Sequence, residues 1–310
     1  MRRLWRTLSA VALGAVTTGV ALGDGNAGAA RAEEVLRLAR AAVGGEERLR
    51  GVQSLTIKGK FRRVVQEREM SGEREFDLLL PDRFMRTESL VLPGMATSVS
   101  STRAVSGGQF WTSGGGRPGG MMIVMRGDGG EPSPEQKARA EQEQARQMRA
   151  EMARYVLALL LGAPADFPLR FNYAGEATAD DGSADVIDAT GPEGFSARLF
   201  LDKQTHLPLM LTYRAPKPRV FTMTMRPGDG HKGKSPEELV KEAEDRAKAE
   251  APAKPEEDEM QLRFEDYRES GGLLLPHRIT SGADGETTEE FEVRSYALNP
   301  RFKADKFQKK

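Results

Sequence analysis

The chain has 310 residues, with 46 basic and 46 acidic side chains and a formal net charge of zero. This balance argues against nucleic acid as the main partner. Cysteine is absent, which excludes disulfides, a cysteine nucleophile and lipid attachment to a cysteine at a signal-peptide junction, so core burial alone must hold the fold.

The first 32 residues have the composition of a secretory signal peptide. Residues 1–6 are basic, residues 8–22 are mostly apolar, and small residues lead to Ala29 and Ala32, either of which could precede the cleavage site. The apolar run is shorter than the roughly 20 residues of a spanning helix, although an uncleaved anchor is the alternative. We therefore expect export, to the periplasm in a two-membrane bacterium, with no membrane span left after cleavage.

An amphipathic helix and a series of strands are predicted next. Residues 33–49 place Val35 and Leu36 toward one side of a helix, and Gly44-Gly45 predicts a break near its end. Apolar and polar residues then alternate, as in strands with one buried face. The predicted strands are 54–65, 74–80, 83–90, 97–105, 109–112 and 121–125.

A long helix is predicted in the middle of the chain, after a glycine- and proline-rich loop at 113–134. Ser133 precedes Pro134 as an N-cap would, and the helical pattern continues to Leu161. The second half of the helix has apolar residues at spacings of three and four. This stripe consists of Met148, Met152, Tyr155, Val156, Leu159 and Leu160. We expect residues 134–161 to be an inserted lid helix.

Strands resume after this helix. They are predicted at 169–173, 184–189, 195–202, 207–213, 259–267, 274–281 and 287–296. Residues 215–258 interrupt the series with a charged, low-complexity insert. The helices are too few for parallel α/β winding, which needs one after nearly every strand. The predicted fold class is therefore mainly β with α (α+β), an antiparallel meander forming a single domain over residues 33–310.

Residues 228–235 match the phosphate-binding pattern G-x-x-x-x-G-K-[ST], in which Lys234 would contact phosphates and Ser235 a magnesium ion. The surroundings do not fit this chemistry. The following segment, 236–251, is charged almost all round, and no apolar strand ending in a magnesium-binding aspartate follows. We interpret the motif as part of the insert between strands.

The other motifs indicate no catalytic or metal site. Residues 114–119 match G-x-G-x-x-G but contain Arg-Pro and precede an apolar strand, and both they and the Arg-Gly-Asp tripeptide at 126–128 predict loops. The histidines His206, His231 and His277 lack metal-ligand spacing. No G-x-S-x-G elbow is present. We expect no catalytic residue, no metal and no cofactor, with a hydrolase as a minor alternative.

Several segments together resemble exported proteins of the LolA family, the outer-membrane lipoprotein carriers. These segments are 41–59, 78–84, 200–208 with 211–213, 264–268 with 272–276, and 296–307. They cover most of the chain beyond residue 32 and consist of turns and strand starts. The resemblance implies an unclosed antiparallel β half-barrel whose concave apolar face is covered by helices and binds acyl chains or other lipid. The insert at 215–258 has no counterpart in the carrier.

We therefore expect a non-enzymatic carrier or binding protein of the cell envelope, related to lipoprotein sorting, that holds a lipid or the acyl chain of a lipoprotein. The expected ligand-binding residues are Phe61, Phe76, Leu78, Phe84, Trp111, Met148, Met152, Tyr155, Leu159, Leu262 and Phe264. A packed core without a cavity is the alternative interpretation of these residues. A second alternative is a structural or stress-sensing adaptor that contacts an envelope protein through the charged segments 134–150 and 235–258.

Overall fold

The computed structural model describes residues 25–65, 68–91, 98–114, 133–180, 182–216 and 257–309. The strands are β1 (Ser54–Val65), β2 (Arg68–Leu79), β3 (Arg83–Val91), β4 (Ser98–Ser106), β5 (Gln109–Ser113), β6 (Arg170–Ala179), β7 (Gly182–Thr190), β8 (Ser196–Asp202), β9 (Pro208–Pro216), β10 (Glu257–Ser270), β11 (Leu273–Ala283) and β12 (Glu286–Leu298). The helices are α1 (Gly25–Val43), α2 (Glu46–Arg50), α3 (Pro134–Leu160) and a 3-10 turn, Pro192–Gly194.

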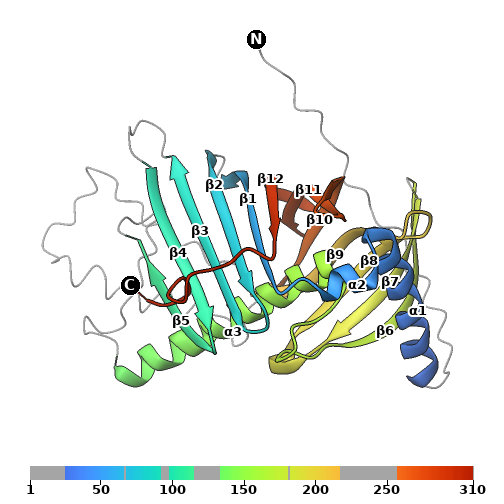
Figure 1. Cartoon of the computed structure of the whole chain (residues 1–310), viewed down its shortest axis with the longest axis horizontal. Helices are drawn as coiled ribbons and strands as arrows, with labels where there is room; N and C mark the ends of the chain where they lie inside the picture. Colours follow the sequence, from blue (N-terminus) through green and yellow to red (C-terminus); the bar gives the residue numbers. More distant parts are fainter. Residues whose placement is uncertain are drawn as a thin grey trace, which may run out of the picture.

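All of these strands belong to one antiparallel sheet of 12 strands with the order β5-β4-β3-β2-β1-β12-β11-β10-β9-β8-β7-β6 (Figure 1). The first and last strands of the chain pair in the middle of the sheet, where Phe61 lies opposite Phe291. The two edges, β5 and β6, are consecutive in sequence and are joined by the segment that contains α3. The helix therefore crosses from one edge toward the other, and the predicted fold class, an unclosed antiparallel sheet with helices, is confirmed.

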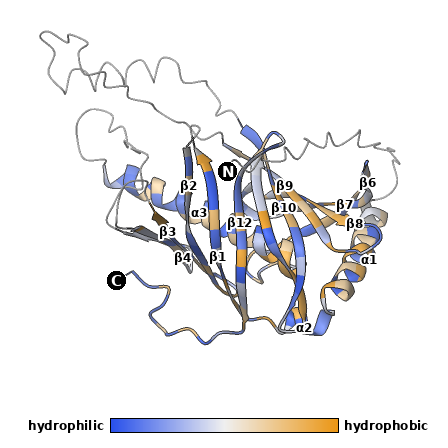
Figure 2. Cartoon of the chain, turned by 90° about the horizontal axis from the view of Figure 1, so that it is seen from above, coloured by the Kyte–Doolittle hydropathy of each residue, from blue (hydrophilic) through white to orange (hydrophobic). Residues whose placement is uncertain are grey.

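The alternation of side chains gives the sheet two different faces. On β1, Ile57 and Phe61 are fully buried while Lys58 and Lys60 are exposed. Figure 2 shows this alternation as hydrophobic and hydrophilic bands along β1. We call the face that carries Phe61 the inner face, because α3 packs against it, and the opposite face the outer face.

The N-terminal helix is interrupted where the sequence predicts. α1 ends at Val43, Gly44 and Gly45 take positive φ angles of 146° and 99°, and α2 follows. α1 begins at Gly25, earlier than the predicted residue 33, and packs against β6. Its buried side is formed by Ala32, Val35, Leu36, Ala39 and Val43, at helical spacing.

The hairpin between β10 and β11 has a two-residue loop, Gly271-Gly272. Ser270 pairs with Leu273 across it, and the two glycines have φ angles of 61° and 82°. A loop with two positive φ angles matches the twist of the strands, and glycine adopts it without strain. The sequence prediction of a glycine turn at this point is confirmed.

Several strands extend beyond their predicted limits, three of them in a way that changes the predicted organisation. β2 begins at Arg68 instead of residue 74, β6 continues to Ala179 instead of 173, and β10 begins at Glu257, inside the predicted insert 215–258. These extensions contain few large apolar residues, and backbone pairing continues through them because ladder hydrogen bonds do not require apolar side chains. The predicted strand 121–125, the motif at 228–235 and residues 217–256 of the insert lie outside the described residues.

The outer face of β3, β4 and β5 is covered by the C-terminal segment. Trp111 packs there with Met85, Ala104, Phe302 and Phe307, and its Nε1 donates a hydrogen bond of 2.8 Å to the carbonyl of Phe307. Trp111 pairs with Ala104, whereas the inner-face residue Val105 pairs with Phe110. The expectation that Trp111 lies on the ligand-facing side is therefore wrong, because neighbouring residues of a strand face opposite ways.

Candidate functional site

The apolar stripe of α3 packs directly on the inner face of the sheet. The ring of Tyr155 lies 4.7 Å from that of Phe76 and 6.3 Å from that of Phe84. Phe76 also contacts Phe291 edge-on, with centroids 5.7 Å apart. These ring separations and orientations are favourable for aromatic pairs, so the contacts stabilise the packing of α3 on the sheet.

Ten of the eleven expected ligand-binding residues lie in this one buried cluster, and the eleventh, Trp111, lies on the outer face. The ten are Phe61, Phe76, Leu78, Phe84, Met148, Met152, Tyr155, Leu159, Leu262 and Phe264. Leu262 is the most exposed of them, at 9%. The sequence therefore identified side chains that the fold brings together, and their contact with a ligand stays a prediction.

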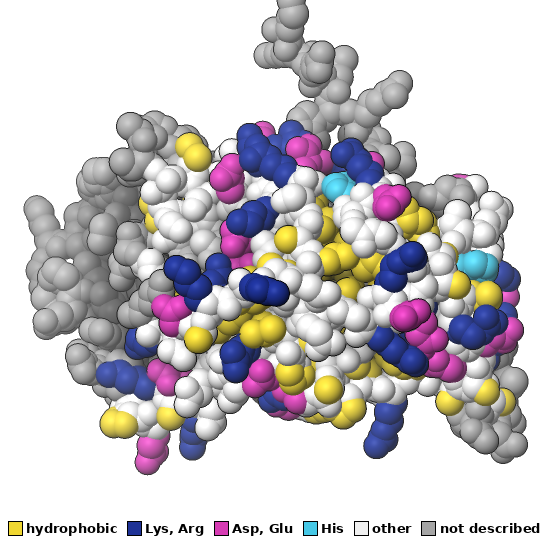
Figure 3. All heavy atoms as spheres, viewed as in Figure 1, with side chains coloured by type: hydrophobic (Ala, Val, Ile, Leu, Met, Phe, Trp, Pro, Cys, Tyr) yellow, Lys and Arg dark blue, Asp and Glu magenta, His cyan; other side chains and the backbone are white. Residues whose placement is uncertain are grey.

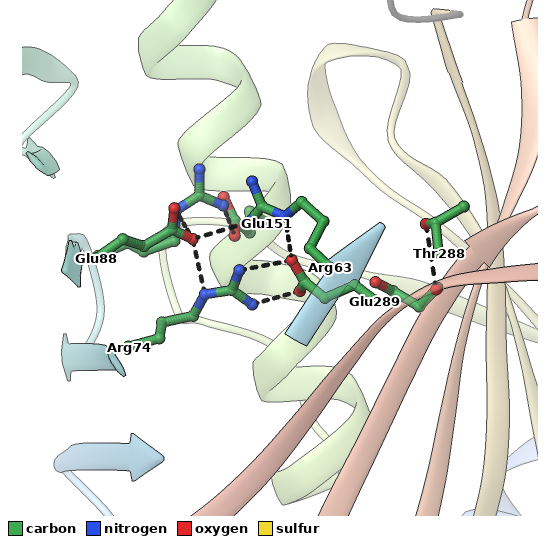
Figure 4. A network of polar contacts seen from close by, with 8 residues as sticks. Arg63, Arg74, Glu88, Glu151, Thr288 and Glu289 are labelled. Atoms are coloured by element: carbon green, nitrogen blue, oxygen red, sulfur yellow. Dashed lines mark hydrogen bonds and ion pairs between the residues drawn. The ribbon is translucent and has the colours of Figure 1, made fainter. Parts of the chain in front are cut away.

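Beside this apolar cluster the inner face carries a network of charged side chains (Figure 4). Arg74 donates two hydrogen bonds to Glu289, of 2.6 and 2.8 Å, and a third of 2.7 Å to Glu88. Arg63 donates to the same Glu289 over 2.7 Å. The network joins β1, β2, β3 and β12, and its bidentate geometry is the strong form of the arginine–carboxylate pair.

Arg74 is only 6% exposed, and aromatic rings surround its guanidinium. The centre of the guanidinium lies 4.6 Å from the ring centroid of Phe61 and 5.5 Å from that of Phe291. Gly59 is directly opposite Arg74, so no side chain from β1 competes for this space. Stacking on rings and pairing with two carboxylates together offset the cost of burying the charge.

The network perturbs the acidity of its carboxylates. Burial alone would raise the pKa of Glu289, but hydrogen bonds and charge from Arg74, with Arg63, outweigh it and lower that pKa to about 2. The pKa of Glu88 is lowered in the same way, where the charges of Arg74, Arg86 and Arg63 outweigh burial. Both carboxylates are therefore ionised in the folded protein at neutral pH.

Charged side chains also tie α3 to the sheet. Arg86 of β3 donates a 2.8 Å hydrogen bond to Glu151 of the helix, and Arg149 makes one of 2.8 Å to Glu193. The guanidinium of Arg154 lies 4.0 Å from the ring centroid of Tyr213 on β9. The helix is thus held by its apolar stripe and by polar contacts on both sides of that stripe.

A cavity of about 970 Å³ lies alongside α3 above the inner face. Its apolar lining comes from Phe167, Phe195, Leu262, Ile279 and Phe291. Its charged lining consists of arginines 63, 74, 86, 103, 146, 154, 198 and 214 together with the carboxylates of Glu143, Glu151, Asp188, Glu193, Glu257, Glu259 and Glu289. A volume of this size lies within the roughly 300–1,000 Å³ of ligand pockets, so the site can hold an elongated molecule that is apolar along one part and charged at another.

The arginines are the site residues that the sequence analysis missed. Arg63 lies two residues after Phe61, Arg74 two before Phe76, Arg86 two after Phe84 and Arg103 two before Val105. Residues two apart on a strand face the same side of the sheet, so each of these arginines lies on the inner face together with an apolar residue of the core. The alternation of side chains along each strand could have identified these arginines as site residues, because a charged side chain on a buried face needs a partner or a ligand.

The histidines lie outside this cavity or outside the described residues. The backbone N–H of His206 bonds to Asp202 in the β8–β9 turn, and the ring of His277 lies 3.1 Å from the carbonyl of Leu275 and packs edge-on against Tyr296. Within the described ranges no group of three or more His, Cys, Asp or Glu side chains could hold a metal ion. None of the helices in the described part of the chain has both the length and the apolarity needed to cross a membrane.

On the face shown in Figure 3, basic and acidic side chains of the described residues are interleaved and form no large patch of one sign. This distribution agrees with the zero formal charge of the chain. A nucleic-acid surface would need clustered basic residues.

No protein-family model and no curated protein sequence matches the chain. Among solved structures it is similar to a LolA superfamily protein from Nitrosomonas europaea, with 10% identity, a TM-score of 0.45 and coverage of 90% of this chain and 97% of the other. It is also similar to a putative outer membrane lipoprotein-sorting protein domain from Vibrio parahaemolyticus, with 11% identity, a TM-score of 0.44 and the same two coverages.

Proposed function

We propose that this protein is a non-enzymatic binding protein of the cell envelope that holds one lipid, or the acyl part of a lipoprotein, against the inner face of the sheet. The observation that carries the proposal is the cavity of about 970 Å³ beside α3, whose lining contains both apolar residues and charged side chains. The basic, then apolar, then small-residue N-terminus supports export, to the periplasm in a two-membrane bacterium.

The helix α3 is the element that would adapt to a ligand. Its stripe includes Met148 and Met152, whose unbranched side chains fit surfaces of more than one shape. A chain entering the cavity would lie along the helix face that carries Ala150, next to Leu262 and Phe291. The buried stripe would then lie beside the ligand, packed against the sheet.

Titration of delipidated protein with a fluorescent fatty acid tests this function. We expect saturable uptake of one molecule per chain. Ala150→Trp, which fills the cavity from α3, should weaken uptake at least tenfold, whereas Ala140→Trp, on the exposed first part of the same helix, should leave it unchanged. Failure of the wild-type protein to take up the probe would contradict the proposal.

A second candidate function is an adaptor for an envelope protein. The first residues of α3, Pro134 to Gln142, are all exposed and extend beyond β5 (Figure 1). Exposed polar and charged side chains on a helix are accessible to a partner protein. Purification from the envelope with one stoichiometric protein partner and no lipid would favour this function over the carrier.

A further inference from the structure

Among the described residues, the charged network on β1 to β4, β12 and α3 contains more arginines than carboxylates. The network contains four arginines, Arg63, Arg74, Arg86 and Arg103, and three glutamates, Glu88, Glu151 and Glu289. The glutamates are all engaged by the first three arginines. Within this network Arg103 is the arginine that no carboxylate contacts, although the charges of Glu88 and Glu151 act on it from a distance.

Arg103 makes no hydrogen bond or ion pair within the described part of the chain, although it is half-buried and lines the cavity. It lies directly opposite Arg86 in the β3–β4 register. Like charges in directly opposite positions destabilise a sheet, so the protein gains no stability from this pair. Burial, and after it the charge of Arg86, lowers the pKa of Arg103 from its usual value, yet a guanidinium stays charged at neutral pH.

An oxyanion bound between Arg86 and Arg103 would accept hydrogen bonds from both guanidinium groups and compensate their charges. Arg103 has five N–H donors and Arg86 uses only some of its own, on Glu151. Guanidinium groups bind phosphate and carboxylate in bidentate fashion, and an anion between two arginines would turn their repulsion into attraction.

We propose that Arg103 and Arg86 form an oxyanion subsite that binds the phosphate or carboxylate headgroup of the ligand, while its chain lies along the apolar part of the cavity. This inference rests on the proposed binding function and specifies its ligand class, an anionic amphiphile. Phe291, Ile279 and Leu262 line the same cavity, so headgroup and chain have separate places in it.

Isothermal titration calorimetry with four probes tests the subsite: dodecyl phosphate, monododecanoylglycerol, dodecyltrimethylammonium and inorganic phosphate, the amphiphiles below their critical micelle concentrations. We expect dodecyl phosphate to bind at least tenfold more tightly than either other amphiphile. Arg103→Gln should remove that preference and leave binding of monododecanoylglycerol unchanged. The control Arg139→Gln, on the exposed part of α3, should change neither affinity.

The outcomes separate the two proposals. Equal binding of the three amphiphiles, unaffected by Arg103→Gln, would overturn the subsite and leave the binding function standing. Binding of no amphiphile would overturn both. Inorganic phosphate that binds as tightly as dodecyl phosphate, and loses this on Arg103→Gln, would support the subsite with a free anion as its source.

Stability of the variant provides a second measurement. Arg103→Gln removes a partly buried charge that lies opposite a like charge and makes no ion pair with Glu88 or Glu151, so we expect its thermal midpoint to equal or exceed that of the wild type. A clear fall in the midpoint would show that Arg103 is a structural residue and would overturn the subsite.

Discussion

Arg74 joins three strands from a position that is almost fully buried. It donates to Glu289 of β12 and to Glu88 of β3, and its guanidinium packs on Phe61. Removing one partner of a buried ion pair is costly, because the remaining charge is left without compensation. We therefore predict that Arg74→Met lowers the free energy of unfolding by about 3 kcal/mol, measured by urea denaturation.

Arg62→Met is the matched control. Arg62 lies on the neighbouring strand β1 and makes a 3.0 Å ion pair with Glu290 of β12, but its side chain is 48% exposed. Exposed pairs contribute less than about 1 kcal/mol, so this variant should differ little from the wild type. An equal decrease in the free energy of unfolding in the two variants would show that burial of the network does not increase its contribution to stability.

The low pKa of Glu289 predicts a dependence of stability on pH. Since the pKa is about 2 in the folded protein and near its ordinary value of 4.5 when unfolded, the unfolded state binds more protons in between, and stability falls as the pH drops from 5 toward 2. Between pH 6 and pH 3 the wild type should lose about 2 kcal/mol more than Glu289→Gln. Parallel pH profiles of the two proteins would contradict this assignment.

For single residues, the sequence predicted which apolar side chains are buried better than it predicted which charged side chains form the network. Phe76 and Phe84 could be assigned from alternation alone, because burial of an aromatic side chain needs no particular partner. Arg74 faces the same side of the sheet as Phe76, but its role in the buried ion pair depends on Glu289, which is 215 residues away in the sequence. That proximity comes from the pairing of β1 with β12, which no local pattern encodes.

Among the elements, α3 has two parts with different environments. The residues from Pro134 to Gln142 are exposed, whereas Met148, Met152 and Tyr155 pack on the sheet. Helices in water derive most of their stability from such packing. The predicted Ser133 cap is confirmed, as the hydroxyl accepts from the backbone N–H of Gln136 over 3.2 Å.

We predict that hydrogen exchange will divide α3 in the same way. Amides from Met148 to Leu160 should exchange at least a hundredfold more slowly than those from Lys137 to Gln142, because opening the second part requires exposure of the core. Mass spectrometry of peptides from the two parts measures this difference. Uniform protection along the helix would mean that its first part also packs against something.

The sequence also could not decide whether the stripe of α3 faces a ligand or the core. Both roles require apolar residues at spacings of three and four. The structure places the stripe against Phe76 and Phe84 and leaves the cavity beside it, along Ala150 and Glu151. A ligand in this cavity would therefore meet the flank of the helix, where Ala150 lies between charged side chains such as Glu151 and Arg154.

At the scale of the whole molecule, the order of the strands follows from a simple rule. Every strand pairs with its neighbour in sequence except across α3, and the sheet is completed by the pairing of β1 with β12. The sequence predicted the meander and the long helix, because turns and alternation are local. It did not predict that the break at α3 forms both edges of the sheet, since this depends on contact between the two ends of the chain.

The central claim is that this fold holds an amphiphilic ligand beside α3. Native mass spectrometry of the full protein, purified from the envelope of the cells that make it, tests the claim most directly. We predict a population heavier than the protein chain by the mass of one acyl-containing molecule, which dissociates on mild collisional activation and is reduced in Ala150→Trp. Detection of the bare chain alone in both proteins would contradict the claim.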